Sequence, residues 1–463
     1  MSTYVDGYIA DVPYVRAFIH ELAPAWLDHT AVVSGIMPPE RRNGFTWCDL
    51  GCGQGLTATM LAAMHPAGQF HGVDAMPEHI EHGRRIAAEA AIGNVSFHAA
   101  DFATATDLSL PQFDYIVSHG VYSWISPQAR AAMRSFIDSH LKPGGLVYLS
   151  YNAMPGRAAD LPFQRLVRAI GEVCQGDSIQ RVMAALKIVD SFLELKAPAL
   201  VASPMLAAVK ERHGRLNVAY LAHELMGMHW DPLFVSEVRS DMATIGLRPV
   251  GSATLIENHD TFVLGRAARA ALVAIADDDV RELARDFLID QFFRRDIFVR
   301  AGANLDEQAQ RRRLLDGTFL LARPSAQVEY TFATPAGRLA FENAAARAIV
   351  MALAAGPCRL RDIAEQGDVT PMDVIANAMV LCASTQIRPI EPTHADVASM
   401  NAVILRRLGG PEEVAYLALP CGTAVSIDST LRAVLRGETA DGPDCEAWRT
   451  FLAVHAVEPV KAG

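Results

Sequence analysis

Short apolar runs alternate with amphipathic stretches over residues 45–151. The apolar runs predict five strands, and the stretches between them place apolar side chains at helical spacing. Strands that alternate with helices are typical of right-handed βαβ units around a parallel sheet. We therefore expect an α/β fold here, with strands at Phe45–Leu50, Gln69–Val73, Val95–Ala99, Phe113–Ser118 and Leu146–Ser150.

Beyond residue 152 the pattern becomes mostly helical. Residues 157–214 predict helices broken by prolines, which we interpret as an insertion over the carboxyl edge of the sheet. Asp231–Gly246 and Leu247–Leu255 predict a helix and a strand that return to the sheet. The expected organisation is an N-terminal lid or arm (1–40), a sheet domain (41–156 and 215–265), the insertion (157–214), a helical middle region (266–325) and a C-terminal domain (326–463).

The C-terminal domain is expected to be α+β. Its segments predict a strand at Val328–Phe332, a helix at Ala336–Ala355, a helix pair at Leu360–Gln366 and Pro371–Ser384, and a strand at Gln386–Ile390. That order is compatible with a small winged-helix-like module. Because acidic residues outnumber basic ones after residue 320, we do not expect this module to read DNA.

The composition is that of a packed protein of two or three domains, with 463 residues of which 51% are hydrophobic. The 41 Lys and Arg against 52 Asp and Glu give a formal charge of −11, which disfavours a nucleic-acid substrate. Seven scattered cysteines without CxxC spacing argue against a disulfide framework or a metal site and favour a reducing compartment. With no leader-like N-terminus and no run of about 18 apolar residues, we expect a cytoplasmic protein without a membrane partner.

A glycine-rich segment, Asp49-Leu-Gly51-Cys-Gly53-Gln-Gly55, lies directly after the first strand and opens a helix. Its glycines let a ligand approach the backbone and leave helix N–H groups pointing at it. Asp74 ends the second strand, in the position that pairs with a ribose hydroxyl, and Asp101-Phe102 follows the third. Ligands of open α/β sheets bind outside the carboxyl ends of the strands, so these motifs predict one ligand site.

This set of motifs resembles the class I S-adenosylmethionine-dependent methyltransferases, since glycines at alternate positions differ from the dinucleotide pattern GxGxxG. The resemblance implies a Rossmann-like class I methyltransferase sheet with S-adenosyl-L-methionine as cofactor. It implies that Gly51 and Gly53 lie against the cofactor's amino-acid end and that Asp74 holds the ribose. Further cofactor-binding residues on this resemblance are Asp101 and Phe102, which flank the adenine, and Tyr14, Asp49, Ala75, Met76, His119 and Trp124.

Segments outside those motifs carry a narrower resemblance. They are YIADVPY (8–14), HGVYSW (119–124), SYNAMPG (150–156), AYLAHEL (219–225) and DQFFRRDIF (290–298). Together they resemble bacterial methyltransferases with a methyltransferase regulatory domain, whose characterised rickettsial-type members methylate lysine side chains of outer-membrane proteins. The chain lacks the tryptophan that often follows PG in SYNAMPG, so the acceptor stays open.

Methyl transfer to an amine requires a neutral acceptor, since an ammonium has no lone pair. Burial can lower the pKa of the amine, and a nearby base can take its proton. Tyr122 and Trp124 are expected to line the methyl pocket with aromatic faces, although Trp124 could instead pack under the next helix. Asn152 could offer a carbonyl to the acceptor or cap a turn. The remaining catalytic candidates are Tyr220, His223 and Glu224. They could form an acid/base or substrate-orienting group, or they could simply mark the start of a helix.

The leading hypothesis is a methyltransferase that acts on an acceptor amine, most specifically a protein lysine. The alternatives are a small-molecule N- or O-methyltransferase and a cofactor-sensing regulator whose C-terminal module contacts a partner. A protein or peptide substrate is expected, without nucleic acid, and the length beyond the catalytic core favours a homodimer. The basic clusters Arg294-Arg295, Arg300 and Arg311–Arg313 predict a solvated helix face rather than a binding patch.

Overall fold

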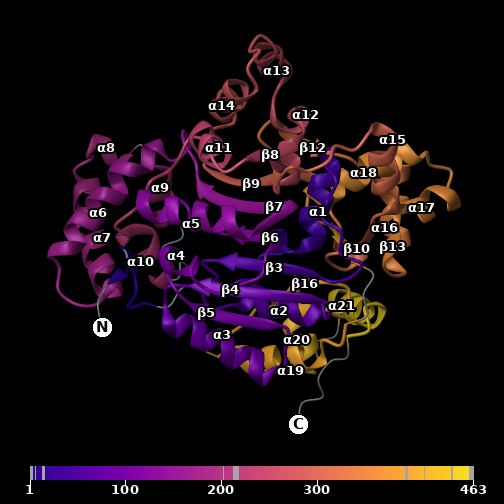
Figure 1. The fold of residues 1–463 in the computed structure, drawn as a ribbon, viewed down its shortest axis with the longest axis horizontal. Helices are drawn as coiled ribbons and strands as arrows, with labels where there is room; N and C mark the ends of the chain where they lie inside the picture. Colours follow the sequence, from indigo (N-terminus) through magenta and orange to yellow (C-terminus); the bar gives the residue numbers. More distant parts are fainter. Residues whose placement is uncertain are drawn as a thin grey trace.

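A seven-stranded sheet in the order β5-β4-β3-β6-β7-β9-β8 forms the centre of the protein (Figure 1). The computed structural model describes residues 4–5, 7–12, 16–201, 203–211, 218–391, 395–410, 412–438 and 442–457. The strands are β3 (Phe45–Leu50), β4 (Gly68–Asp74), β5 (Val95–Ala99), β6 (Phe113–Ser118), β7 (Leu141–Asn152), β8 (Leu247–Ser252) and β9 (Phe293–Arg300). Strands β3 to β7 are parallel, which confirms the Rossmann-like α/β fold, and β9 is antiparallel to both of its neighbours.

Alternate side chains of each strand point to opposite faces of the sheet, and different helices cover the two faces. Trp47 packs in a core with α1 (Pro24–Val33), α2 (Leu56–Met64) and α3 (Pro77–Glu89). Its neighbour Cys48 packs in a second core with α5 (Pro127–His140) and α11 (Val235–Ala243). The carboxyl ends of β3 to β6 remain clear of both layers and are available for a site.

The N-terminal 40 residues are only in part a lid. Helix α1 packs on the sheet, where Trp26 Nε1 donates a hydrogen bond of 2.9 Å to the carbonyl of Ala253. Among the described residues, the short hairpin of β1 (Tyr4–Val5) and β2 (Tyr8–Ile9) and the segment that follows it lie on the side of the helical insertion, where Ile9 and Val12 are buried in the insertion's core.

The insertion is helical, as predicted, and has a core of its own. Its helices are α6 (Leu161–Val173), α7 (Ser178–Glu194), α8 (Pro198–Val201), α9 (Pro204–Glu211) and α10 (Val218–Met226). Helix α10 packs against α6 and α7, although we expected residues 215–265 to belong to the sheet domain. The reason is that Leu221, Ala222 and Leu225 form an apolar stripe that packs in the core shared by the insertion helices and strand β2.

The expectation of a helical region over residues 266–325 is wrong at its centre. Helices α13 (Arg266–Val273) and α14 (Asp278–Ile289) project from the body, and the chain then returns as strand β9 between β7 and β8 (Figure 1). The charged residues of β9 led us to expect a solvated helix face. Arg294 is instead buried in the sheet, with 3% of its surface exposed. It bonds to Glu282 Oε1 (2.7 Å), Asp286 Oδ1 (2.5 Å) and Asp296 Oδ2 (3.0 Å). Three carboxylates thus replace the water that the guanidinium gives up on burial.

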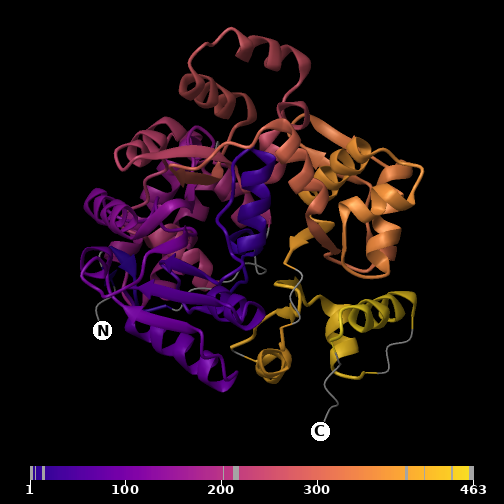
Figure 2. The same cartoon turned by 45° about the vertical axis from the view of Figure 1, so that its right-hand side comes forward.

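The C-terminal part consists of small units that pack on the α1 and α2 side of the sheet (Figure 2). A three-stranded sheet, β13 (Cys358–Arg359), β10 (Thr318–Leu321) and β14 (Ile387–Ile390), packs with α15 (Glu307–Asp316), α16 (Ala344–Ala354), α17 (Leu360–Gln366) and α18 (Pro371–Ala383). Residues 331–340, expected as the end of a strand and the start of a helix, form the hairpin of β11 (Thr331–Thr334) and β12 (Gly337–Ala340). The rest is α19 (Ala398–Arg407), the hairpin β15 (Tyr416–Leu419) and β16 (Thr423–Ser426), α20 (Ser429–Leu435) and α21 (Pro443–Val454). The domain is α+β; its winged-helix-like character stays a prediction.

Among the residues that the structure describes, no helix combines the length and apolar character that crossing a bilayer requires.

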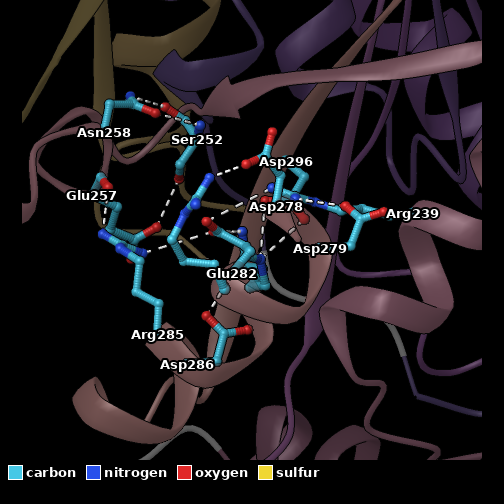
Figure 3. A network of polar contacts seen from close by, with 12 residues as sticks. Arg239, Ser252, Glu257, Asn258, Asp278, Asp279, Glu282, Arg285, Asp286 and Asp296 are labelled. Carbon is cyan, nitrogen blue, oxygen red and sulfur yellow. Dashed lines mark hydrogen bonds and ion pairs between the residues drawn. The ribbon is translucent and has the colours of Figure 1, made fainter. Parts of the chain in front are cut away.

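The ion-pair cluster around Arg294 predicts a large stability effect. Figure 3 shows Glu282, Asp286 and Asp296 converging where α14 meets the sheet. Arg294→Ala leaves these carboxylates buried without their cation, so we expect the free energy of unfolding to fall by about 3–5 kcal/mol. Arg300→Ala is the matched control, because Arg300 pairs with Asp138 near the surface; it should cost less than about 1 kcal/mol. Urea denaturation measures both, and equal losses would contradict the assignment.

Candidate active site

A pocket opens where β3, β4, β5 and β6 end at their carboxyl edge. It encloses about 840 Å³ of empty space, its open mouth included. Nine of the residues expected from sequence to bind a cofactor line it: Gly51, Gly53, Asp74, Ala75, Met76, Asp101, Phe102, His119 and Trp124. The structure thus brings together residues that lie up to 73 positions apart in the chain.

The glycine-rich loop forms the floor of this pocket. Gly51 and Gly53 both adopt positive φ (83° and 52°), which glycine tolerates best. A Cβ on Gly51 would lie 2.5 Å from Val121 Cγ2, whereas a Cβ on Gly53 would meet no atom within 4 Å. Gly53 therefore faces open space in the pocket, and any side chain there would occupy the volume that a ligand needs.

Asp74 joins the glycine-rich loop to the end of β4. Its Oδ2 accepts a hydrogen bond of 2.8 Å from the Gly53 N–H, and its Oδ1 accepts one of 2.9 Å from the Met76 N–H. The carboxylate is thereby fixed at the pocket wall. Carboxylate oxygens can each accept further bonds, so Asp74 could also hold the hydroxyls of a ribose.

Asp49 lies beneath the loop and does not line the pocket. It is 5% exposed, and its Oδ1 has no hydrogen-bond partner in the described part of the chain. Burial, and then repulsion from Asp74, raises the pKa of Asp49 to about 8. A buried carboxyl with an unsatisfied oxygen suits a ligand that brings positive charge, as the amino-acid end of S-adenosylmethionine does. The residues present therefore fit that cofactor.

Asp101 and Phe102 form the side wall at the end of β5. Asp101 caps the short helix α4 (Phe102–Ala105), and its Oδ1 accepts 2.7 Å bonds from both Thr104 N and Thr104 Oγ1. These bonds lower the pKa of Asp101 and keep the exposed carboxylate ionised. Phe102 then presents an aromatic ring to the pocket, as a purine site requires.

His119, Trp124 and Tyr8 enclose the other end of the pocket. Burial lowers the pKa of His119 to about 4, so its imidazole is neutral, and its Nδ1 lies 2.8 Å from the Tyr148 hydroxyl. The Trp124 ring stacks on Trp230, with centroids 5.8 Å apart. Trp124 thus both lines the pocket and packs against its surroundings. Tyr14 lies outside the described residues.

Tyr122 does not line the pocket, contrary to our expectation. The turn after β6 directs Val121 and Trp124 into the pocket and Tyr122 into the opposite core, where it is 0% exposed. Its hydroxyl donates to Asp241 Oδ2 (2.7 Å), and burial raises its pKa. Tyr122 therefore holds the turn in place and is out of reach of an acceptor.

None of the three candidates on α10 lines the pocket itself, but His223 contacts Tyr8, which does. The rings of Tyr8 and His223 are 5.2 Å apart, and His223 Nε2 is 2.9 Å from the carbonyl of Val12. Burial raises the pKa of Glu224 to about 7, although Arg157 and a hydrogen bond with Tyr220 lower it. A buried carboxyl whose pKa is raised to near neutral pH is a candidate acid/base group.

Asn152, at the end of β7, is 4% exposed and does not line the pocket. Its backbone N–H donates to Ser123 Oγ (3.0 Å), and its backbone carbonyl accepts from Leu233 N (3.0 Å). The first bond joins β7 to the turn that carries Trp124, and the second joins it to the segment before α11. The structure thus gives Asn152 a place in the support of the pocket wall.

Among the residues near the site that the sequence-based expectation did not name, His79 and Arg157 carry ionisable groups. His79 lines the pocket, with its Nδ1 3.3 Å from Asp74 Oδ1. The Arg157 guanidinium lies 5.3 Å from the Phe292 ring centroid and acts on the charge of Glu224. The only sequence signals are positions: His79 begins the helix after Asp74, and Arg157 ends the segment SYNAMPGR.

Comparisons with known proteins agree with this geometry. Residues 41–194 match the model of a methyltransferase domain, and residues 217–300 match that of a predicted methyltransferase regulatory domain. An uncharacterised protein of Synechocystis sp. is 31% identical over 453 residues, which cover 95% of this chain and 90% of that one. Trans-aconitate 2-methyltransferase of Methylobacterium radiotolerans is 34% identical over 122 residues, 26% of this chain and 42% of its own.

The fold also matches a solved structure along almost its whole length. PKMT2 from Rickettsia typhi in complex with AdoHcy gives a TM-score of 0.70 at 19% identity, over 97% of this chain and 93% of that one.

A Rossmann-like sheet with a glycine-rich loop and acidic strand ends around one pocket defines a class I, S-adenosylmethionine-dependent methyltransferase. Both domain models match in succession, and the Synechocystis relative matches nearly end to end. The chain therefore belongs to the family of methyltransferases that carry a methyltransferase regulatory domain. Its cofactor is S-adenosyl-L-methionine.

Filling the open space at Gly53 should abolish cofactor binding. In Gly53→Arg a long side chain enters the pocket, and the positive φ adds backbone strain. We expect calorimetry with S-adenosylhomocysteine to show at least a hundredfold loss of affinity. Gly93→Arg is the matched control, because Gly93 is exposed and no atom lies within 4 Å of its Cβ position. Near-normal affinity of Gly53→Arg would refute the placement of the loop.

Proposed function

We propose that this methyltransferase transfers a methyl group to an acceptor amine, and that the acceptor is a protein lysine. The observation that carries the proposal is Glu224, a buried carboxyl with a pKa of about 7 on helix α10, where the adjacent residue His223 contacts the pocket-lining Tyr8. An amine must lose its proton before it can accept a methyl group, and a base poised near neutral pH can take it.

The cofactor supplies the methyl group as part of a sulfonium, so no metal and no covalent enzyme intermediate are needed. Glu224 receives the proton of the incoming ammonium, and the hydrogen bond with Tyr220 holds the carboxylate in place. Arg157 keeps Glu224 ionised more often than burial alone would allow. The rings of Tyr8 and Trp124 exclude water and attract a cationic acceptor by about 0.5–2 kcal/mol each.

A polypeptide acceptor is favoured by aromatic side chains that remain exposed, one of which contacts Arg157, the residue that acts on the charge of Glu224. Phe292 is 57% exposed and lies against Arg157, and its backbone carbonyl accepts from Ala153 N. Phe287 is 59% exposed and stacks on Phe234, with centroids 6.2 Å apart. Exposed aromatic rings are typical of protein–protein contact surfaces. The match to PKMT2 in fold supports the same substrate class.

A small-molecule N- or O-methyltransferase remains the second candidate. The likeness to trans-aconitate 2-methyltransferase covers only about a quarter of this chain. It leaves the choice of acceptor open, because 122 residues cannot span both the glycine-rich loop at residues 49–55 and helix α10 at Val218–Met226. The choice therefore rests on direct assay.

A cytoplasmic location is part of the proposal, since all seven cysteines are free and suit a reducing compartment. So is the homodimer, for which the exposed apolar residues Val280 and Leu288 of the projecting helix α14 offer a surface. A monomeric mass in light scattering would refute the homodimer.

The substitution Glu224→Gln should remove the base and keep the shape of the site. The amide can still accept the Tyr220 hydrogen bond but cannot take a proton, so we expect the methylation rate to fall by about 10²- to 10⁴-fold. In the wild type, the ionised form of Glu224 predominates above its pKa, and kcat/KM should rise through about pH 7. The variant should lose that inflection. Glu194→Gln, on an exposed position of α7, is the control; equal rates in the two variants would contradict the role.

The acceptor class is tested with radiolabelled S-adenosylmethionine and a bacterial lysate separated into protein, nucleic-acid and small-molecule fractions. Label in protein that survives base treatment, and that mass spectrometry locates on lysine, is the expected result. Label confined to small molecules would replace the proposal by the second candidate. Label in the nucleic-acid fraction would contradict both.

A further inference from the structure

The basic residues that cluster in the sequence make different contacts in the structure. Arg294 is paired within the buried cluster, Arg295 pairs with Glu21 (3.5 Å), and Arg300 pairs with Asp138 (2.8 Å). In the described part of the chain, the guanidinium groups of Arg312 and Arg313 make neither an ion pair nor a hydrogen bond. Both line a groove, a feature that the predicted solvated helix face did not include.

This groove lies between α1, α15 and the ends of β10 and β14. It encloses about 1310 Å³ of empty space, its open mouth included, and shares no lining residue with the cofactor pocket. Its lining also contains apolar side chains, among them Ala25, Val32, Met37, Pro38 and Phe319. Three parts of the chain meet here: helix α1, which packs on the main sheet, helix α15, which follows β9, and the three-stranded C-terminal sheet that contains β14 (Figure 2).

The groove carries uncompensated positive charge. Its two acidic residues already have partners: Asp28 Oδ2 accepts from Arg41 Nε (2.8 Å), and Asp316 Oδ1 accepts from Arg361 Nε (2.6 Å). Arg42 makes only a 3.6 Å contact with Glu40, in which both side chains are mostly exposed. Arg42, Arg312 and Arg313 thus remain available in a protein whose net charge is −11, where a local basic excess is unexpected.

His29 adds an unsatisfied polar group to the same lining. Its Nε2 is buried and has no hydrogen-bond partner among the described residues, and its ring packs edge-on against Phe319 at 5.3 Å. Burial lowers the pKa of His29 to about 4, so the imidazole is neutral at physiological pH. A buried polar atom without a partner costs free energy that a bound ligand atom can recover.

We propose that this groove binds a small phosphate-bearing molecule with an apolar body. Guanidinium groups match the oxygens of a phosphate in paired hydrogen bonds, and arginines from two walls suit a group with several acceptor oxygens. The apolar lining takes the non-ionic part of the molecule. Because the ligand would bridge α1, α15 and β14, it would tie the C-terminal domain to the sheet. The proposal is independent of the identity of the methyl acceptor.

Calorimetry on the full chain with inorganic pyrophosphate as the probe tests this site. The wild type should bind it at 150 mM salt, and the double variant Arg312→Glu/Arg313→Glu should bind about a hundredfold more weakly. Arg311→Glu is the matched control, because Arg311 is on the same helix but does not line the groove. It should leave the affinity within about twofold. Equal weakening in both variants would mean unspecific charge attraction and would overturn the proposal, as would the absence of binding to the wild type.

Two further readouts separate a built site from other causes. Pyrophosphate should raise the Tm of the wild type and of Arg311→Glu but not that of the double variant, because a ligand stabilises the folded state that binds it. Unchanged affinity for S-adenosylhomocysteine in the double variant shows that its fold is intact. A single-stranded oligonucleotide that binds more tightly than pyrophosphate, and loses affinity in the double variant, would overturn the small-molecule proposal in favour of a polymer.

Discussion

The contact between the Gly53 N–H and Asp74 Oδ2 holds the site together. It joins the loop after β3 to the end of β4, and the Gly51 and Cys52 N–H groups reinforce it with bonds to the carbonyl of Val73 (2.8 and 3.1 Å). Two adjacent parallel strands therefore end at a fixed separation, with a glycine turned toward open space between them. The acidic wall at Asp74 and the burial of Asp49 both follow from this arrangement.

The site needs two parts of the chain that are remote in sequence. The sheet provides the cofactor pocket, whereas the base candidate Glu224 belongs to the insertion helices and to the regulatory-domain match. Tyr8 joins the two parts, because it lines the pocket and contacts His223. The regulatory domain thus contributes side chains beside the pocket as well as strands β8 and β9 at the edge of the sheet. Movement of α10 relative to the sheet would change the position of Glu224 directly.

Local signals in the sequence were sufficient for the parallel part of the sheet and for most of the cofactor pocket. The glycines, Asp74 and Asp101 lie at strand ends, where the chain pattern alone fixes their position. Strand β9 was not predictable in this way, since Arg294 is buried through Glu282 and Asp286 of α14, eight or more residues away, and Asp296 through Tyr151 of β7. Tyr122 was misplaced because a turn between Val121 and Trp124 can direct its middle residues either way. Long-range packing decided that choice.

A crystal structure of the protein with S-adenosylhomocysteine tests the arrangement most directly. The ligand's amino-acid end should lie over Gly51 and Gly53, its ribose hydroxyls should contact Asp74, and its sulfur should face Tyr8 and the side chain of Glu224. A ligand bound in the same pocket with its sulfur directed away from α10 would contradict the role of Glu224. A ligand bound elsewhere would contradict the site itself.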